Sequence, residues 1–223
     1  MYKCCIFDLD GTLIDSIKAI SHTCNLTLNK YNLGPIEEND YKVYVGEGYK
    51  KLVERALIHC GDKDLANYED ALITYMDYFK IHCMHEVVPY DGITNMLEFL
   101  KKNNIKVAIL SNKPHERTID NVNGVFGNDY FDRVSGEVKD IKRKPDPQGA
   151  IITAKELGVL PQDCLYIGDT DTDMKTGIAA KMDTVGVTWG FRNRKELSEY
   201  NPKYIIDRPE EIISILKESN NIK

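Results

Sequence analysis

Short apolar segments alternate along the chain with longer segments whose apolar residues recur at helical spacing. The clearest apolar segments are 3–8, 106–110 and 164–168, and each of them ends at charged or polar residues. Uninterrupted apolar runs of this length are typical of strands that are buried on both faces of a sheet. Weaker segments of the same kind cover residues 133–136, 184–188 and 204–206.

Helical spacing fills the intervals between these strands. Apolar residues recur every three or four positions over 92–102 and over 147–157. Pro147 suits the first turn of the second helix, and Gly158 follows it where glycine commonly ends a helix. Strands that alternate with helices predict an α/β fold with a parallel, Rossmann-like sheet.

The segment between the first strand and residue 88 has a different pattern, because it contains no run of strand type. Its apolar residues keep helical spacing, and glycines divide it into three or four helices. We interpret it as an all-helical insert that rejoins the core near Val88 and Pro89. We therefore predict a core domain from residues 1–15 and 89–223, and a cap domain from residues 16–88. Two chain connections between them make the cap a candidate hinged lid.

Composition narrows the range of partners. The 223 residues are 42% hydrophobic and carry 29 basic against 35 acidic side chains, a formal net charge of −6. This balance argues against a nucleic-acid surface created by overall charge. No apolar run approaches the ~18 residues that span a bilayer, and Asp8 and Asp10 interrupt the apolar N-terminal stretch. The six cysteines form no CxxC pair, so we expect reduced thiols in a cytoplasmic protein that is a monomer or homodimer without a membrane partner.

Acidic residues follow the first and the last of the three clear strands. Asp8 and Asp10 face the same side of an extended chain, and Gly11 permits a sharp turn after them. Carboxylates held so close repel each other unless a cation lies between them, and hard oxygen ligands suit Mg²⁺. Asp169 and Asp173 belong to a second cluster, which helix capping alone does not explain. A solvated acidic turn is the alternative for either motif taken alone.

Two other strand or loop ends supply hydrogen-bond donors. Ser111 and Asn112 follow the strand 106–110, and Lys144 precedes two prolines just before a helix. Each is an ordinary turn signal when taken alone. Together with the carboxylates, however, they lie at the C-terminal ends of predicted parallel strands, where open α/β sheets bind ligands. This set of groups fits a phosphate that is bound through Mg²⁺.

The order of these motifs resembles the haloacid dehalogenase superfamily, in particular phosphohydrolases with a helical cap of the phosphoglycolate phosphatase type. The motifs are DLDGTLIDS (8–16), LSNK (110–113), RKPDP (143–147), YIGDTDTDMKTGIAA (166–180), VGVTWGF (185–191) and YIIDRPEEI (204–212). The resemblance implies a Mg²⁺-dependent phosphatase for a small phosphorylated metabolite, with 2-phosphoglycolate as the first candidate.

The resemblance also implies roles for individual residues. Asp8 would be the nucleophile that forms an aspartyl-phosphate, and Asp10 would be the general acid and base. Mg²⁺ would be held by the carboxylates of Asp8 and Asp169 and by the backbone carbonyl of Asp10. Asp173 would orient the metal site or Lys144 without binding metal itself.

The remaining implied roles concern the phosphoryl group. Thr12, Ser111, Asn112 and Lys144 would bind its oxygens, and Lys144 would also stabilise Asp8 during catalysis. The loop from Val45 to Lys50 resembles the cap loop that faces the active site in this family. Candidate cations for an acidic substrate are Lys50, Lys51, Arg55 and Lys113.

Several alternatives stay open within the same fold. A pyrophosphatase or a sugar-phosphate phosphatase would use the same core groups. Thr12 and Ile20 argue against a phosphoglucomutase, because mutases of this fold often have Val and His at those positions. A cap lysine would be needed for a phosphonate hydrolase, and the insert contains several. A non-catalytic binding protein would be expected to lack one of the catalytic groups, and here none is missing.

Overall fold

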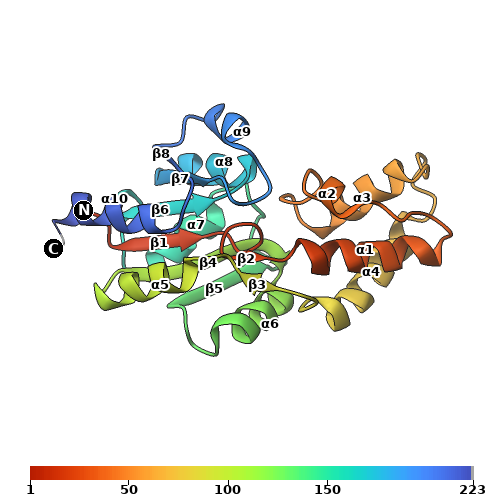
Figure 1. The fold of residues 1–223 in the computed structure, drawn as a ribbon, viewed down its shortest axis with the longest axis horizontal. Helices are drawn as coiled ribbons and strands as arrows, with labels where there is room; N and C mark the ends of the chain where they lie inside the picture. Colours follow the sequence, from red (N-terminus) through yellow and green to blue (C-terminus); the bar gives the residue numbers. More distant parts are fainter. Residues whose placement is uncertain (222–223) are drawn as a thin grey trace.

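The computed structural model, which describes residues 1–221, consists of a central sheet with helices on both faces and a group of helices beyond one end of that sheet (Figure 1). The sheet has six strands, all parallel, in the order β5-β4-β1-β6-β7-β8. These strands are β1 (Cys4–Phe7), β4 (Lys106–Pro114), β5 (Arg133–Glu137), β6 (Cys164–Gly168), β7 (Asp183–Val187) and β8 (Tyr204–Ile206). The predicted α/β fold with a parallel sheet is confirmed.

Both faces of the central strand are buried, which explains its uninterrupted apolar run. Cys5 and Phe7 of β1 point into one apolar cluster, and Cys4 and Ile6 point into another. The first cluster includes residues of α5 (Ile93–Lys102), α6 (His115–Phe126) and α10 (Glu210–Asn220). The second includes residues of α7 (Gln148–Glu156) and Ala180 at the end of α8 (Asp171–Ala179). The short helices η1 (Pro161–Asp163) and α9 (Arg194–Ser198) complete this part of the chain.

In chain order, four helices follow the first strand of the sheet and precede its other five strands. They are α1 (Ile17–Lys30), α2 (Glu38–Tyr41), α3 (Tyr49–His59) and α4 (Tyr68–His82). They share their own apolar cluster, in which Tyr41, Tyr75 and Phe79 are almost fully buried. The chain enters and leaves this region through β2 (Ile14–Asp15) and β3 (Val88–Pro89), which pair antiparallel. The helical insert therefore begins and ends at the same pair of short strands, β2 and β3. Its assignment as a separate domain stays a prediction.

The two described ends of the chain lie together at the end of the sheet far from the helical insert (Figure 1). The backbone N–H of Tyr2 donates to the side chain of Asn220 at 2.7 Å. The opposite end of the sheet, where the strands have their C-terminal ends, faces the insert.

One strand is longer than its apolar run. The sequence predicts that the strand starting at residue 106 stops before Ser111, but β4 continues to Pro114, with a register shift against β5 beyond Leu110. The prediction was wrong because it took the loss of hydropathy as the end of the strand. Ser111, Asn112 and Lys113 are polar and yet buried, since they face the interior of a site rather than solvent.

Candidate active site

The motif residues Asp8, Asp169, Asp173 and Lys144 meet at the C-terminal edge of the sheet. Strand β1 lies between β4 and β6, with Phe7 in register with Ile109 and Ile167. Asp8 therefore emerges beside the end of β6 and beside β4, which continues to Pro114, and Asp169 follows β6 directly. Asp8 is 6% exposed, and Asp169 is fully buried.

Lys144 joins two of the carboxylates. Its Nζ lies 2.8 Å from Asp8 Oδ1 and 2.7 Å from Asp173 Oδ1, and its side chain is 2% exposed. Burial alone would lower the pKa of Lys144. The negative charges of Asp173 and Asp8 outweigh that effect, so the pKa is raised well above the ordinary lysine value. Lys144 is therefore held as an ammonium ion inside the protein.

Three carboxylates nevertheless face this single ammonium. Oxygens of Asp8, Asp169 and Asp173 lie within 4.8 Å of one another. Burial, followed by repulsion from Asp173, raises the pKa of Asp169 to about 7 and raises the pKa of Asp8 well above its ordinary value. This uncompensated negative charge, carried by hard oxygen donors, fits a divalent cation such as Mg²⁺.

Asp173 uses both of its oxygens within the protein. Oδ1 accepts from Lys144, and Oδ2 accepts from the backbone N–H and the hydroxyl of Thr170 at 3.1 and 2.7 Å. These contacts form a capping box at the start of α8. A side chain at Gly168 would overlap the Asp173 carboxylate, so a residue without Cβ is required there. Asp173 is thus held by Thr170 and in turn holds the Lys144 ammonium.

Asp169 is oriented from two sides. It accepts from the hydroxyl of Thr12 at 3.0 Å and from the backbone N–H of Phe191 at 2.8 Å. Gly11 has a φ of +83°, as the predicted sharp turn requires, and any Cβ there would overlap the Asp169 carboxylate. Thr12, which we expect to bind the substrate, donates its hydroxyl to Asp169 and its backbone N–H to the carbonyl of Leu9. In the structure Thr12 therefore orients the Asp169 carboxylate.

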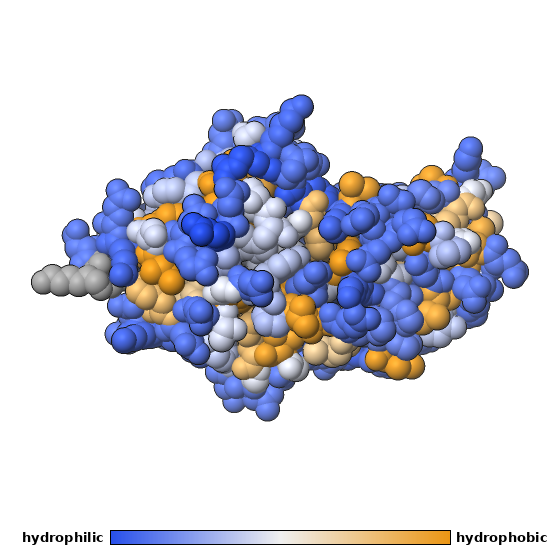
Figure 2. Space-filling view, viewed as in Figure 1, coloured by the Kyte–Doolittle hydropathy of each residue, from blue (hydrophilic) through white to orange (hydrophobic). Residues whose placement is uncertain are grey.

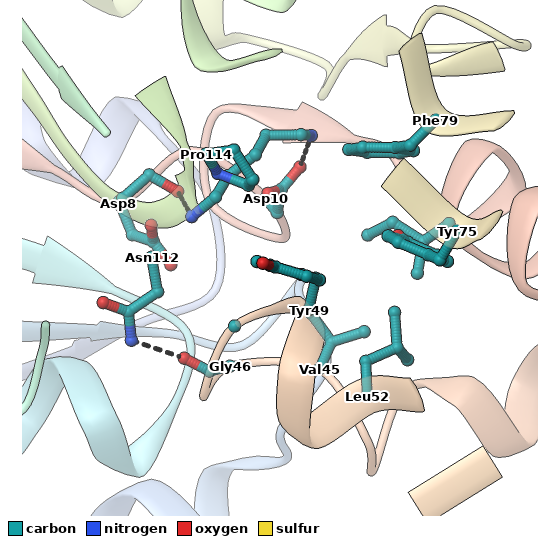
Figure 3. A pocket seen from close by; sticks show the side chains of 14 residues that line it. Asp8, Asp10, Val45, Gly46, Tyr49, Leu52, Tyr75, Phe79, Asn112 and Pro114 are labelled. Atoms are coloured by element: carbon teal, nitrogen blue, oxygen red, sulfur yellow. Dashed lines mark hydrogen bonds and ion pairs between the residues drawn. The ribbon is translucent and has the colours of Figure 1, made fainter. Parts of the chain in front are cut away.

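Asn112 was also predicted to contact the phosphoryl group, and it has other partners. Its amide nitrogen donates to the carbonyls of Gly46 and Lys144, both at 3.0 Å, and its amide oxygen accepts from the Lys144 N–H at 2.9 Å. The bond to Gly46 crosses from the sheet to the helical insert (Figure 3). Asn112 thus fixes the backbone that carries Lys144. Beside it, the hydroxyl of Ser111 accepts from the Lys113 N–H at 3.2 Å.

Two arginines of the core bind the same insert loop, a role that their sequence context does not predict. Arg192 donates to the carbonyls of Lys42 and Val45, the latter at 3.0 Å, and Arg143 donates to the carbonyl of Glu47 at 3.3 Å. Arg143 belongs to the RKPDP motif (143–147), and Arg192 directly follows the VGVTWGF segment. These positions were visible in the sequence, but the hydrogen-bond partners of the two side chains were not.

Asp10 lines the same cavity as Asp8. Its Oδ1 accepts from the Ser16 hydroxyl at 2.5 Å and from the Lys113 ammonium at 2.6 Å. Lys113 is only 3% exposed in its side chain. In Figure 3 the Asp10 carboxylate points toward the Phe79 ring, and the dashed line beside it marks the pair with Lys113.

A cavity separates these core groups from the insert (Figure 3). Asp8, Asp10 and residues 111–114 form its core side. The insert side is mostly hydrocarbon and aromatic, and it consists of Ile20, Val45, Gly46, Gly48, Tyr49, Leu52, Tyr75 and Phe79. The cavity therefore joins a charged end on the core side to an apolar end on the insert side.

The face of the molecule in Figure 2 is mainly hydrophilic. On the face in Figure 2, hydrophilic side chains cover most of both parts of the molecule, and hydrophobic ones form small scattered groups. Within residues 1–221, no helix combines the length and the hydropathy needed to cross a membrane. All six cysteines are free thiols.

The sequence and the fold were compared with known proteins. Residues 5–187 match the family model of haloacid dehalogenase-like hydrolases. The phosphoglycolate phosphatase of Colwellia psychrerythraea is 31% identical over 216 residues, which cover 95% of this chain and 96% of that protein. The Aquifex aeolicus phosphoglycolate phosphatase is 31% identical over 215 residues, 95% of either chain. The crystal structure of a predicted phosphatase from Clostridium acetobutylicum superposes with a TM-score of 0.85 at 27% identity, over 98% of this chain and 99% of that one.

Proposed function

The chain belongs to the haloacid dehalogenase-like hydrolases, and from that premise we propose that this phosphoric monoester hydrolase uses Mg²⁺ and acts on 2-phosphoglycolate. The observation that carries the proposal is the buried group of Asp8, Asp169, Asp173 and Lys144 at the C-terminal edge of the parallel sheet. The printed names of the relatives support the choice of substrate.

Asp8 and Asp169 would hold Mg²⁺ with their carboxylates, together with the backbone carbonyl of Asp10. The bound ion would offset the repulsion between the Asp8 carboxylate and the phosphate dianion and would polarise the phosphoryl oxygens. The hydrogen bonds that Asp169 accepts from Thr12 and Phe191 fix its orientation before any ligand arrives. Asp173 holds the Lys144 ammonium against Asp8 and so contributes indirectly.

Asp8 is the proposed nucleophile. Its hydrogen bonds within residues 1–221 all fall on Oδ1, from the Leu9 N–H at 2.7 Å and from Lys144 at 2.8 Å. Oδ2 therefore keeps its lone pairs for attack on phosphorus, which forms an aspartyl-phosphate and releases the alkoxide. Lys144 and the Ser111 hydroxyl would stabilise the charge that develops on the phosphoryl oxygens.

Asp10 is the proposed general acid for the leaving alkoxide and the general base for the water that cleaves the aspartyl-phosphate. Ser16 and Lys113 both bind its Oδ1, which leaves Oδ2 to carry the proton. Residues 16–88 would act as a cap domain over the core formed by residues 1–15 and 89–223. The two connections lie side by side as β2 and β3, which supports a hinge at that point.

The setting of this activity is a further part of the proposal. We propose that the protein works in the cytoplasm as a monomer or homodimer and binds neither nucleic acid nor membrane. The free thiols support the cytoplasmic location, and the net charge of −6 argues against nucleic acid as a partner.

The test is phosphate release from a panel of substrates, with Mg²⁺ and with EDTA. The panel contains 2-phosphoglycolate, sugar phosphates, pyrophosphate and an aryl phosphate. We expect Mg²⁺-dependent turnover with a clear preference for 2-phosphoglycolate, and a loss of at least ~10³-fold in Asp8→Asn. Acid quenching of the wild-type reaction should leave phosphate attached to Asp8. Preference for pyrophosphate or for a sugar phosphate would overturn the proposed substrate, and turnover that persists in Asp8→Asn would overturn the mechanism.

A further inference from the structure

Lys113 is a buried cation that the proposed chemistry does not use directly. Its side chain is 3% exposed, and its Nζ lies 2.6 Å from Asp10 Oδ1 and 5.2 Å from the centre of the Phe79 ring. An ammonium has three N–H donors, and only the contact with Asp10 is matched by an acceptor among residues 1–221. Lys113 also lines the cavity, so it has donors to spare at the point where a substrate would lie.

The other cations proposed from the sequence lie elsewhere. Lys51 pairs with Glu54, Arg55 pairs with Glu47, and Lys50 is exposed on the outside of the insert. Lys144 is held between Asp8 and Asp173, at the phosphoryl end of the site. Within the described residues, Lys113 is the one cationic side chain that lines the cavity.

The position of Lys113 fixes which part of a substrate it meets. If Asp10 protonates the ester oxygen of the leaving group, the substituent on that oxygen lies beside Asp10. The ammonium of Lys113, in contact with Asp10, then faces the first atoms of the leaving group. Phe79, Tyr75 and Leu52 enclose the space on the far side with apolar surface. An anion in such surroundings gains more from a cation than it would in water, and unpaired hydroxyl groups would lose hydrogen bonds.

We propose that Lys113 is the specificity-determining residue of this site, and that it selects phosphoesters with a carboxylate on the carbon next to the ester oxygen. The inference rests on the proposed phosphatase function. The carboxylate takes the spare N–H donors of Lys113, while Ser16 keeps Asp10 in place through its own hydrogen bond. A carboxylate one methylene further out would be pushed toward the apolar wall.

The test compares two substrates of nearly equal size, 2-phosphoglycolate and 2-hydroxyethyl phosphate, in which a neutral alcohol replaces the carboxylate. We expect wild-type kcat/KM to favour 2-phosphoglycolate by about 10²-fold or more. Lys113→Met should remove most of that preference, mainly by lowering kcat/KM for 2-phosphoglycolate. Lys113→Arg should retain part of it, because it keeps a cation in place. Lys51→Met, which removes an exposed cation of the insert, is the matched control and should leave the preference unchanged.

The outcomes separate this inference from the proposed function. No turnover of any phosphoester by the wild type would overturn the proposed function itself. Turnover of both substrates without preference would overturn the inference and leave the phosphatase intact. Equal losses on both substrates in Lys113→Met, in protein whose circular dichroism matches the wild type, would show that Lys113 acts only through Asp10, and this also overturns the inference. If Lys113→Met does not fold, the Lys113→Arg variant provides the test. A folded Lys113→Arg protein that has lost the preference for 2-phosphoglycolate would contradict the proposal that the charge of Lys113 selects the substrate.

Discussion

The side chain of Asn112 ties the backbone of the core to the carbonyl of Gly46 in the helical insert, at 3.0 Å. The same amide group makes two hydrogen bonds to the backbone of Lys144. One residue thus connects the strand β4, the loop that carries the buried lysine and the insert loop over the cavity. The position of Lys144 and the closure of the insert therefore depend on a common set of hydrogen bonds.

Replacing Asn112 by alanine should impair both functions of this side chain. We expect the free energy of unfolding to fall by about 1–3 kcal/mol, because the Lys144 N–H and C=O lose buried partners. We also expect kcat/KM for the phosphatase reaction to fall by ~10-fold or more, since small displacements of catalytic groups are costly. Urea unfolding and steady-state kinetics measure the two effects.

The matched control for this change is Asn128→Ala. Asn128 is exposed, and its side chain makes no hydrogen bond within residues 1–221, so we expect a change within about 0.5 kcal/mol. Unaltered stability and activity in Asn112→Ala would show that water replaces these hydrogen bonds without loss.

The acid-base behaviour of Asp169 gives a second prediction. Its pKa is raised to about 7 by burial and by Asp173, so between pH 4 and 7 the folded protein binds more protons there than the unfolded chain does. Without metal, the free energy of unfolding should therefore decrease as the pH rises through this range, and Asp169 should contribute roughly a few kcal/mol to that decrease. Mg²⁺ should restore the loss, so its stabilising effect should be larger at pH 8 than at pH 5.

Thermal unfolding at several pH values, with and without Mg²⁺, measures this effect. Asp169→Asn is the appropriate comparison, because it removes the charge and keeps the shape. The difference between wild type and variant isolates Asp169 from surface carboxylates with lowered pKa, such as Asp183 and Asp207, whose contribution has the opposite sign. A wild-type pH dependence that Asp169→Asn reproduces in full would refute the assignment.

The strands and the gathering of polar groups at one edge of the sheet were predictable from the sequence. Apolar runs marked β1, β4 and β6, and parallel pairing brings their C-terminal ends together. Parallel pairing of these strands therefore predicts that the carboxylates which follow them lie close together. The end of β4 was predicted too early, because the polar residues Ser111 to Lys113 are buried in the site and are not exposed to solvent.

The partners of individual polar side chains were not predictable in the same way. Thr12 and Asn112 occupy motif positions, but their hydrogen bonds go to Asp169 and to Gly46 and Lys144. Arg192 reaches a loop about 150 residues away in the chain. Hydropathy and spacing place a residue at an edge of the sheet, whereas the choice among nearby acceptors depends on how distant loops pack.

The last prediction concerns two glycines that face each other in register on neighbouring strands, Gly168 of β6 and Gly186 of β7. A Cβ at Gly168 would overlap the Asp173 carboxylate, whereas a Cβ at Gly186 would meet Leu197 at an ordinary 3.4 Å. Gly168→Ala should therefore displace Asp173 and, through it, Lys144. We expect activity to fall by ~10²-fold and the free energy of unfolding by about 1–3 kcal/mol, as for overpacking of a rigid core.

Gly186→Ala, with the same added methyl group in the same sheet, should keep its activity. Kinetics and urea unfolding of both variants test the difference, and equal effects would mean that the close approach at Gly168 does not position Asp173.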